Sequence, residues 1–153
     1  MTASFEPFVS KESPWVHFVS MNRDLESAIE FVRNSGGAVI ELDGSRMRDV
    51  ERLFSEYAAA FNFPDYFGRN WDAFHECLVT LEAKPSPSYL SIVHAASELL
   101  SEESSKIPNY LRLMESIGKS WAHAFALGSE WGGGEVAFNT ALVAPGFVIP
   151  DPR

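Results

Sequence analysis

The sequence has only one cysteine, Cys77, among its 153 residues. One cysteine excludes an internal disulfide and a zinc site built from several thiolates. The chain also lacks an apolar run approaching the ~18 residues that a membrane-spanning helix needs. Its first fifteen residues contain Glu6 and no long apolar stretch. We therefore expect no secretory signal, no membrane association and a cytoplasmic location.

Basic residues are scarce as well. Twelve Lys and Arg stand against 21 Asp and Glu, which gives a formal net charge of −9. An acidic surface repels phosphate backbones, so we expect no direct binding of nucleic acid. Acidity often serves solubility alone, but it also attracts basic proteins. The hydrophobic content of 46% and charged content of 22% are those of a globular chain, and the length fits one domain.

Signatures of catalysis are missing from the chain. It has no G-x-S-x-G motif and no dinucleotide fingerprint, and the glycine run 132–134 lacks the lysine of a phosphate loop. Asp72, His75 and Glu76 could be read as metal ligands, but such a site needs a second set from another helix. An enzyme using these three residues would need a cleft that all three line. We therefore expect a protein that is not an enzyme and holds no cofactor or metal.

The order of predicted elements indicates an α/β fold. Apolar and β-branched runs predict four strands, at 15–19, 38–42, 89–95 and 136–144. Helical periodicity and capping residues predict helices at about 22–34, 49–62, 71–82, 96–104 and 108–127. This alternation favours a mostly parallel sheet packed by helices. We expect one domain over 1–145, with a glycine-rich loop at 128–134 and an extended, proline-rich tail at 146–153.

The predicted helix 71–82 has two contrasting faces. At ~100° per residue, one sector next to Trp71 holds the residues we expect to be buried: Phe74, Cys77, Leu78 and Leu81. The opposite sector holds the residues we expect to be exposed: Asp72, His75, Glu76 and Val79.

Two interpretations of the acidic sector are open. The first is a solvated face, with Asp72 near the helix N-terminus because the macrodipole favours a negative charge there. The second is an acidic docking face for a basic protein, with Val79 and the aromatic residues Tyr66 and Phe67 of the preceding loop as apolar anchors.

The second interpretation gains support from a resemblance. The segment 38–78 has a short Val-Ile strand, an Asp-Gly turn and a helix, followed by PDYFGRNWDAFHECL at 64–78. This arrangement resembles the barstar family of intracellular ribonuclease inhibitors, whose pattern there is P-[DE]-Y-[YF]-G-x-N-x-D-A-[FL]-x-[DE]-C-L. The resemblance covers 38–95 well and 96–144 by the order of elements. Residues 1–35 lie outside it and are expected to be an added βα unit on a barstar-like core at 36–145.

The resemblance implies a fold and a function. The fold is a small parallel sheet of three core strands, here with a fourth from 15–19. The function is stoichiometric inhibition of a basic ribonuclease of the barnase type by a bacterial antitoxin or immunity protein, monomeric when free. Asp72 and Glu76 would enter the nuclease's phosphate-binding cleft. The expected nuclease-binding residues are Tyr66, Phe67, Gly68, Asn70, Asp72, His75, Glu76 and Val79.

The chain departs from the family pattern at two positions of this face. Glu76 stands where the family usually has aspartate, and His75 stands where it often has tryptophan. The family also has a further acid on the helix before the last strand, for which Glu115 is a candidate. An alternative function is a non-catalytic interaction module that binds another basic partner on the same scaffold. A binding patch around Trp131 and Phe138 would favour that alternative.

Overall fold

A computed structural model describes residues 5–81, 86–123 and 136–144. Its centre is a four-stranded sheet in the order β1-β4-β3-β2, and every neighbouring pair is parallel. The strands are β1 (Val16–Val19), β2 (Ala38–Asp43), β3 (Ser88–His94) and β4 (Ala137–Val143). The predicted α/β class and the fourth strand near the N-terminus are thus confirmed, and the sheet is parallel throughout.

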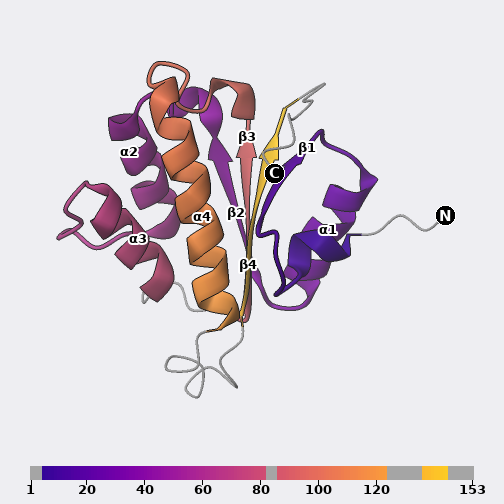
Figure 1. The fold of residues 1–153 in the computed structure, drawn as a ribbon. Coiled ribbons are helices and arrows are strands. Elements are labelled where there is room, and N and C mark those ends of the chain that lie inside the picture. The colour runs from indigo at the N-terminus through magenta and orange to yellow at the C-terminus, as the bar shows by residue number, and fades with distance from the viewer. Residues whose placement is uncertain (1–4, 82–85, 124–135, 145–153) are drawn as a thin grey trace.

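Helices cover both faces of this sheet (Figure 1). One face carries three helices, α2 (Val50–Phe61), α3 (Trp71–Thr80) and α4 (Ile107–Ala122). The other face carries α1 (Arg23–Asn34) and the short 3-10 helix η1 (Glu6–Val9). Parallel strands need both faces covered, and this explains why the interior residues of β3 and all of β4 are buried.

Side-chain caps fix where three of the helices begin. The side chains of Asn22, Asp49 and Asn70 accept hydrogen bonds from the amides of Leu25, Arg52 and Ala73, respectively. Each bond satisfies one of the amides that a helix N-terminus leaves without an intrahelical partner. At their C-terminal ends, α2 and α3 stop at residues in the left-handed region, Asn62 (φ 56°) and Leu81 (φ 39°).

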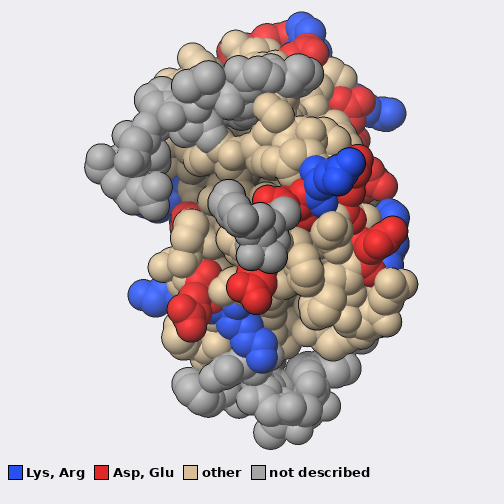
Figure 2. Space-filling view, turned by 90° about the vertical axis from the view of Figure 1, so that its right-hand side faces the viewer, with Lys and Arg blue, Asp and Glu red and all other residues tan. Residues whose placement is uncertain are grey.

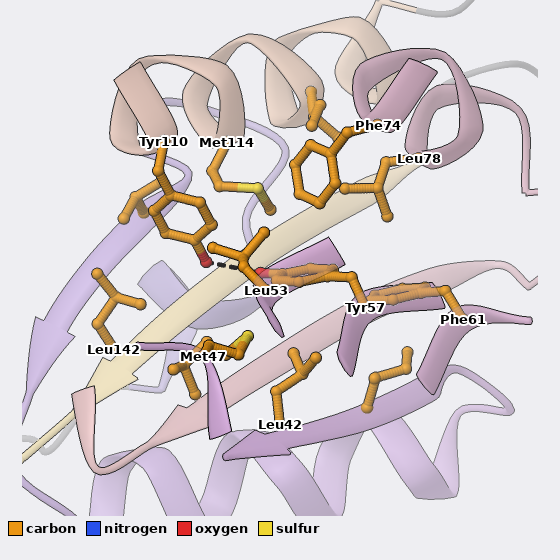
Figure 3. Packing of buried hydrophobic residues seen from close by; sticks show 14 of the residues in the cluster. Leu42, Met47, Leu53, Tyr57, Phe61, Phe74, Leu78, Tyr110, Met114 and Leu142 are labelled. Atoms are coloured by element: carbon orange, nitrogen blue, oxygen red, sulfur yellow. Dashed lines mark hydrogen bonds between the residues drawn. The ribbon is translucent and has the colours of Figure 1, made fainter. Parts of the chain in front are cut away.

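The larger hydrophobic core lies between the sheet and the three helices (Figure 3). The rings of Tyr57 from α2 and Tyr110 from α4 meet inside it, and their hydroxyl oxygens are 2.6 Å apart in a buried hydrogen bond. Burial raises the pKa of both tyrosines, so both remain neutral donors and acceptors. The phenylalanine rings of α2 and α3, Phe54 and Phe74, pack together at a centroid distance of 5.7 Å. These contacts join α2 to α4 and α2 to α3.

The N-terminal segment is bonded into the sheet rather than appended to it. Strand β1 pairs with β4, and the carboxylate of Glu115 on α4 accepts hydrogen bonds from the amides of Trp15 (3.1 Å) and Val16 (2.9 Å). Gly118 allows the close approach, because a Cβ there would lie 2.3 Å from Trp15. Residues of η1 and α1 complete a second core cluster with β3 and β4: Phe8, Leu25, Ala28, Val32, Leu90, Ile92, Ala141 and Val143.

Two helix predictions need correction. The segment 96–104 is not an α-helix but contains short 3-10 turns, Ala96–Glu98 and Ser104–Lys106. Its backbone turns away at Leu100 (φ 54°), whose amide bonds to the carbonyl of Met47 at 2.7 Å instead of continuing a helix. Helix α4 ends at Ala122, short of the predicted position 127. The predicted glycine-rich loop and proline-rich tail lie outside the described residues.

Candidate functional site

Helix α3 presents two carboxylates to solvent. Asp72 and Glu76 are exposed, whereas Phe74 and Leu78 on the opposite side are fully buried and Cys77 and Leu81 are nearly so. The helical-wheel prediction is confirmed for these residues. The two acids are one turn apart and therefore lie on the same strip of the helix surface.

One flank of α3 is less exposed than the wheel predicted. Val79 is half-buried and packs against the main core, so the prediction that it is exposed is wrong. His75 is also half-buried, and its Nε2 lies 3.4 Å from Oγ of Ser116 on α4. The wheel considers one helix by itself, and it cannot show that a neighbouring helix covers this flank. The open strip of α3 is therefore narrower than predicted and is centred on Asp72 and Glu76.

The loop before α3 turns one aromatic residue out and the other in. Tyr66 is 81% exposed, the most exposed of the large hydrophobic residues in the described chain. Phe67 instead packs edge-to-face on Phe54 and Phe63, at centroid distances of 5.5 and 5.0 Å. Trp71 at the start of α3 packs on Phe54 as well, at 5.2 Å. Phe67 thus anchors the loop, and Tyr66 is left free to contact a partner.

Short-range hydrogen bonds shape the same loop. The amide of Phe67 donates to the carbonyl of Pro64 at 3.0 Å and closes a turn around Tyr66. The side chain of Asn70 accepts from the amide of Ala73 at 2.8 Å and donates to the carbonyl of Gly68 at 3.3 Å. Gly68 and Asn70 therefore lie at the junction of the loop and the helix.

A basic residue in this loop was missed by the sequence analysis. Arg69, at φ 52°, extends its guanidinium toward α2, where it bonds to Glu51 and Ser55. It is the only lysine or arginine between positions 53 and 83. The absence of other basic residues nearby is the feature of the sequence that could have pointed to Arg69.

A groove runs along α3 on the side away from α4. It is lined by Phe61, Asn62, Phe63, Pro64, Tyr66, Glu76, Cys77, Thr80 and Leu81. Neither Asp72 nor His75 lines it, so it is not a cleft that brings the three candidate acid–base residues together. Burial, with a smaller contribution from the charge of Glu76, raises the pKa of the Cys77 thiol, which disfavours the reactive thiolate.

Other candidate residues are placed elsewhere in the molecule. Glu115, the candidate for a further nuclease-binding acid, is half-buried and bonded to the backbone of β1. Phe138 is fully buried in the core, so it cannot form a surface patch, and Trp131 lies outside the described residues. Across 5–81, 86–123 and 136–144, no cluster of three or more metal-ligating side chains occurs. The helices in these ranges are too short or too polar to cross a membrane.

Comparison with protein-family models shows which family the chain belongs to. The model described as Barstar (barnase inhibitor) matches residues 37–128, more than half of the chain. The chain belongs to the barstar family. The match contains β2, α2, the loop, α3, β3 and α4 but begins after α1, so the barstar-family segment is preceded by the N-terminal βα unit. A search of curated proteins found no significant match.

Proposed function

We propose that this protein is a stoichiometric inhibitor of a basic, barnase-type ribonuclease, and that it binds through α3 and the preceding loop. The observation that carries the proposal is the joint exposure of Tyr66, Asp72 and Glu76 on one side of a barstar-family chain. The loop takes its shape from Gly68 and Asn70, and Phe67 anchors it to the core. His75 and Val79 would contribute at the border of the interface, where they are half-exposed.

The chemistry of inhibition follows from the two carboxylates. A ribonuclease binds RNA phosphates with cationic side chains, and two carboxylates one helical turn apart can pair with those cations in place of phosphates. Bound in this way, the inhibitor excludes RNA by occupying the cleft, and no bond is made or broken. The proposal therefore requires no nucleophile, general base or metal ion on this chain.

Titration of RNA cleavage tests the proposal. A barnase-type ribonuclease at fixed concentration is mixed with increasing amounts of this protein, and we expect activity to end at one inhibitor per enzyme. Glu76→Ala should weaken binding by about 30-fold to several thousand-fold, because it leaves cations of the nuclease buried without a partner. Its fold should be unchanged, since Glu76 is exposed and alanine is a good helix former.

Glu30→Ala is the matched control. Glu30 is exposed on α1, on the opposite face of the sheet, so the variant makes the same change of charge and side chain away from the proposed interface. We expect it to inhibit as well as the unmodified protein. Equal inhibition by Glu76→Ala would contradict the proposal and favour an interaction module that uses another surface.

A further inference from the structure

The contact between Arg69 and Glu51 ties the loop 64–70 to helix α2. The guanidinium Nη2 donates to the carboxylate of Glu51 at 2.8 Å, to the carbonyl oxygen of Glu51 at 2.9 Å and to Oγ of Ser55 at 2.9 Å. The Nε donates to the same carboxylate at 3.1 Å. One side chain of the loop thus bonds to both the backbone and the side chains of the first two turns of α2.

This contact adds little to global stability. The side chains of Arg69 and Glu51 are 42% and 71% exposed, and exposed ion pairs of this kind are weak. Hydrophobic packing already holds the loop to the core without this contact, because Phe67 and Trp71 pack on Phe54. The contact therefore acts locally, on a segment whose outward residues include the exposed Tyr66.

The contact also controls where a positive charge lies. Arg69 is three residues before Asp72, and it is the only basic residue in a stretch that includes Asp65, Asp72 and Glu76. A released arginine side chain could pair with Asp72 and cancel part of the acidic charge. Its contacts with Glu51 and Ser55 instead direct the guanidinium toward α2.

We propose that Arg69 is a positioning residue. Its contact with Glu51, the latch, orders the loop 64–70 and holds the arginine charge away from the acids of α3. The role as a latch for binding rests on the proposed function. The ordering of the loop does not, and it can be measured on the free protein.

Amide hydrogen exchange on the free protein is the direct test. Arg69→Gln keeps an unbranched side chain at the positive φ but removes the charge and the fork of donors. We expect the amides of Phe67 and Ala73 to exchange about two- to fivefold faster, the range for losing an exposed ion pair. The amide of Thr140, bonded to Trp15 across the sheet, should be unaffected and serves as an internal reference.

Arg52→Gln is the matched control. Arg52 lies on α2 and makes ion pairs with Asp49 and Glu102, at 3.7 and 3.9 Å, but none with the loop. The Arg52→Gln variant makes the same change in net charge as Arg69→Gln. We expect its amide hydrogen exchange at Phe67 and Ala73 to stay as in the unmodified protein. Equal exchange in Arg69→Gln and Arg52→Gln would overturn the latch.

Binding kinetics with a barnase-type ribonuclease then separate the latch from charge. Both variants remove one positive charge and should change the association rate to a similar extent. Only Arg69→Gln should raise the dissociation rate, by about two- to fivefold, because the bound loop is less well ordered. If exchange rises as expected and no ribonuclease binds the unmodified protein, the latch stands and the proposed function fails. If binding is tight and both variants dissociate alike, the proposed function stands and the latch is overturned as a binding device.

Discussion

Glu76 is the residue on which the binding proposal depends most, and it is one methylene longer than the aspartate usual in the barstar family. It is exposed on α3 at the edge of a groove that extends toward Tyr66. A longer carboxylate reaches farther from the helix, so in the proposed complex its cationic partner would lie farther away or deeper in the nuclease. The extra methylene therefore predicts a nuclease whose cleft differs in shape from that of the enzymes whose inhibitors carry aspartate.

Glu76→Asp tests this difference. We predict that the cognate nuclease binds Glu76→Asp about tenfold less tightly, because the shortened carboxylate no longer reaches its cations. A barnase-type enzyme whose own inhibitor carries aspartate at this position should show the opposite preference and bind Glu76→Asp more tightly. Dissociation constants for both enzymes, with thermal unfolding to verify the fold, check the prediction. The same order of affinities for both nucleases would contradict it.

His17 shows how a single buried residue makes stability depend on pH. Burial lowers its pKa below 6.5, although the hydrogen bond from Nε2 to Asn139 (2.8 Å) and the charge of Glu115 act in the opposite direction. The unfolded chain therefore binds a proton more readily than the folded chain. Stability is fully present above about pH 6.5 and decreases as pH falls from there toward the lower, folded pKa.

We predict that replacing His17 by a residue that cannot titrate reduces this dependence. Urea unfolding at pH 7.5 and pH 5.5 should show a larger loss of stability on acidification in the unmodified protein than in His17→Gln. The other histidines are present in both proteins, so their contribution cancels in the comparison. An equal loss in both proteins would show that the buried imidazole is not responsible.

At the scale of elements, the sequence predicts best those features that depend on residues close together in the chain. The starts of α1, α2 and α3 and the buried face of α3 depend on residues a few positions apart, and the sequence predicted them closely. The failures have causes that are distant in the sequence. The turn at Leu100 depends on a bond to Met47, which no local pattern reveals.

The same distinction holds within the candidate site. Exposure of Asp72 and Glu76 followed from helical spacing, whereas the partial burial of Val79 depends on the packing of α3 against the rest of the fold. The role of Glu115 was missed because its partners, the amides of Trp15 and Val16, are 99 or more positions away. Contacts across that distance are set by sheet topology and not by spacing.

Glu115 gives a test of how β1 is held. We predict that Glu115→Ala lowers the free energy of unfolding by about 1–3 kcal/mol, because the amides of Trp15 and Val16 lose their acceptor at a partly buried position. Ribonuclease inhibition at a temperature where the variant is folded should be unchanged. Urea unfolding and an inhibition assay check the two parts.

Glu102→Ala provides the comparison for this variant. Glu102 is exposed and makes only long ion pairs, 3.9 Å to Arg48 and to Arg52. Its removal should cost less than ~1 kcal/mol. If Glu115→Ala instead leaves stability unchanged and weakens inhibition, Glu115 is a nuclease-binding acid and the contact with β1 is incidental.

At the scale of the whole molecule, the chain carries a formal net charge of −9, and the surroundings of the exposed acids differ between α1 and α3. On the α1 side, acidic and basic side chains lie next to one another (Figure 2). Arg33 on α1 forms an ion pair with Glu41 on β2. On α3, Asp72 and Glu76 are exposed, and the nearest basic residue in the sequence, Arg69, is bonded to Glu51. A basic partner that approaches α3 would therefore be attracted by two exposed carboxylates.

This distribution predicts a strong effect of salt on association. Exposed charges are screened over about 10 Å at 0.1 M salt, so the attraction that guides a basic ribonuclease toward α3 should weaken as salt rises. The dissociation rate should change less, because charges buried in the complex are screened less than exposed ones. Both effects are measured by stopped-flow association and dissociation rates over a salt range of about 0.02 to 0.5 M. Glu76→Gln should show a shallower salt dependence than the unmodified protein, whereas Glu30→Gln, with the same charge change on α1, should remain close to it. An association rate that does not respond to salt would mean that the acidic face does not guide the partner, even if the complex itself forms through α3.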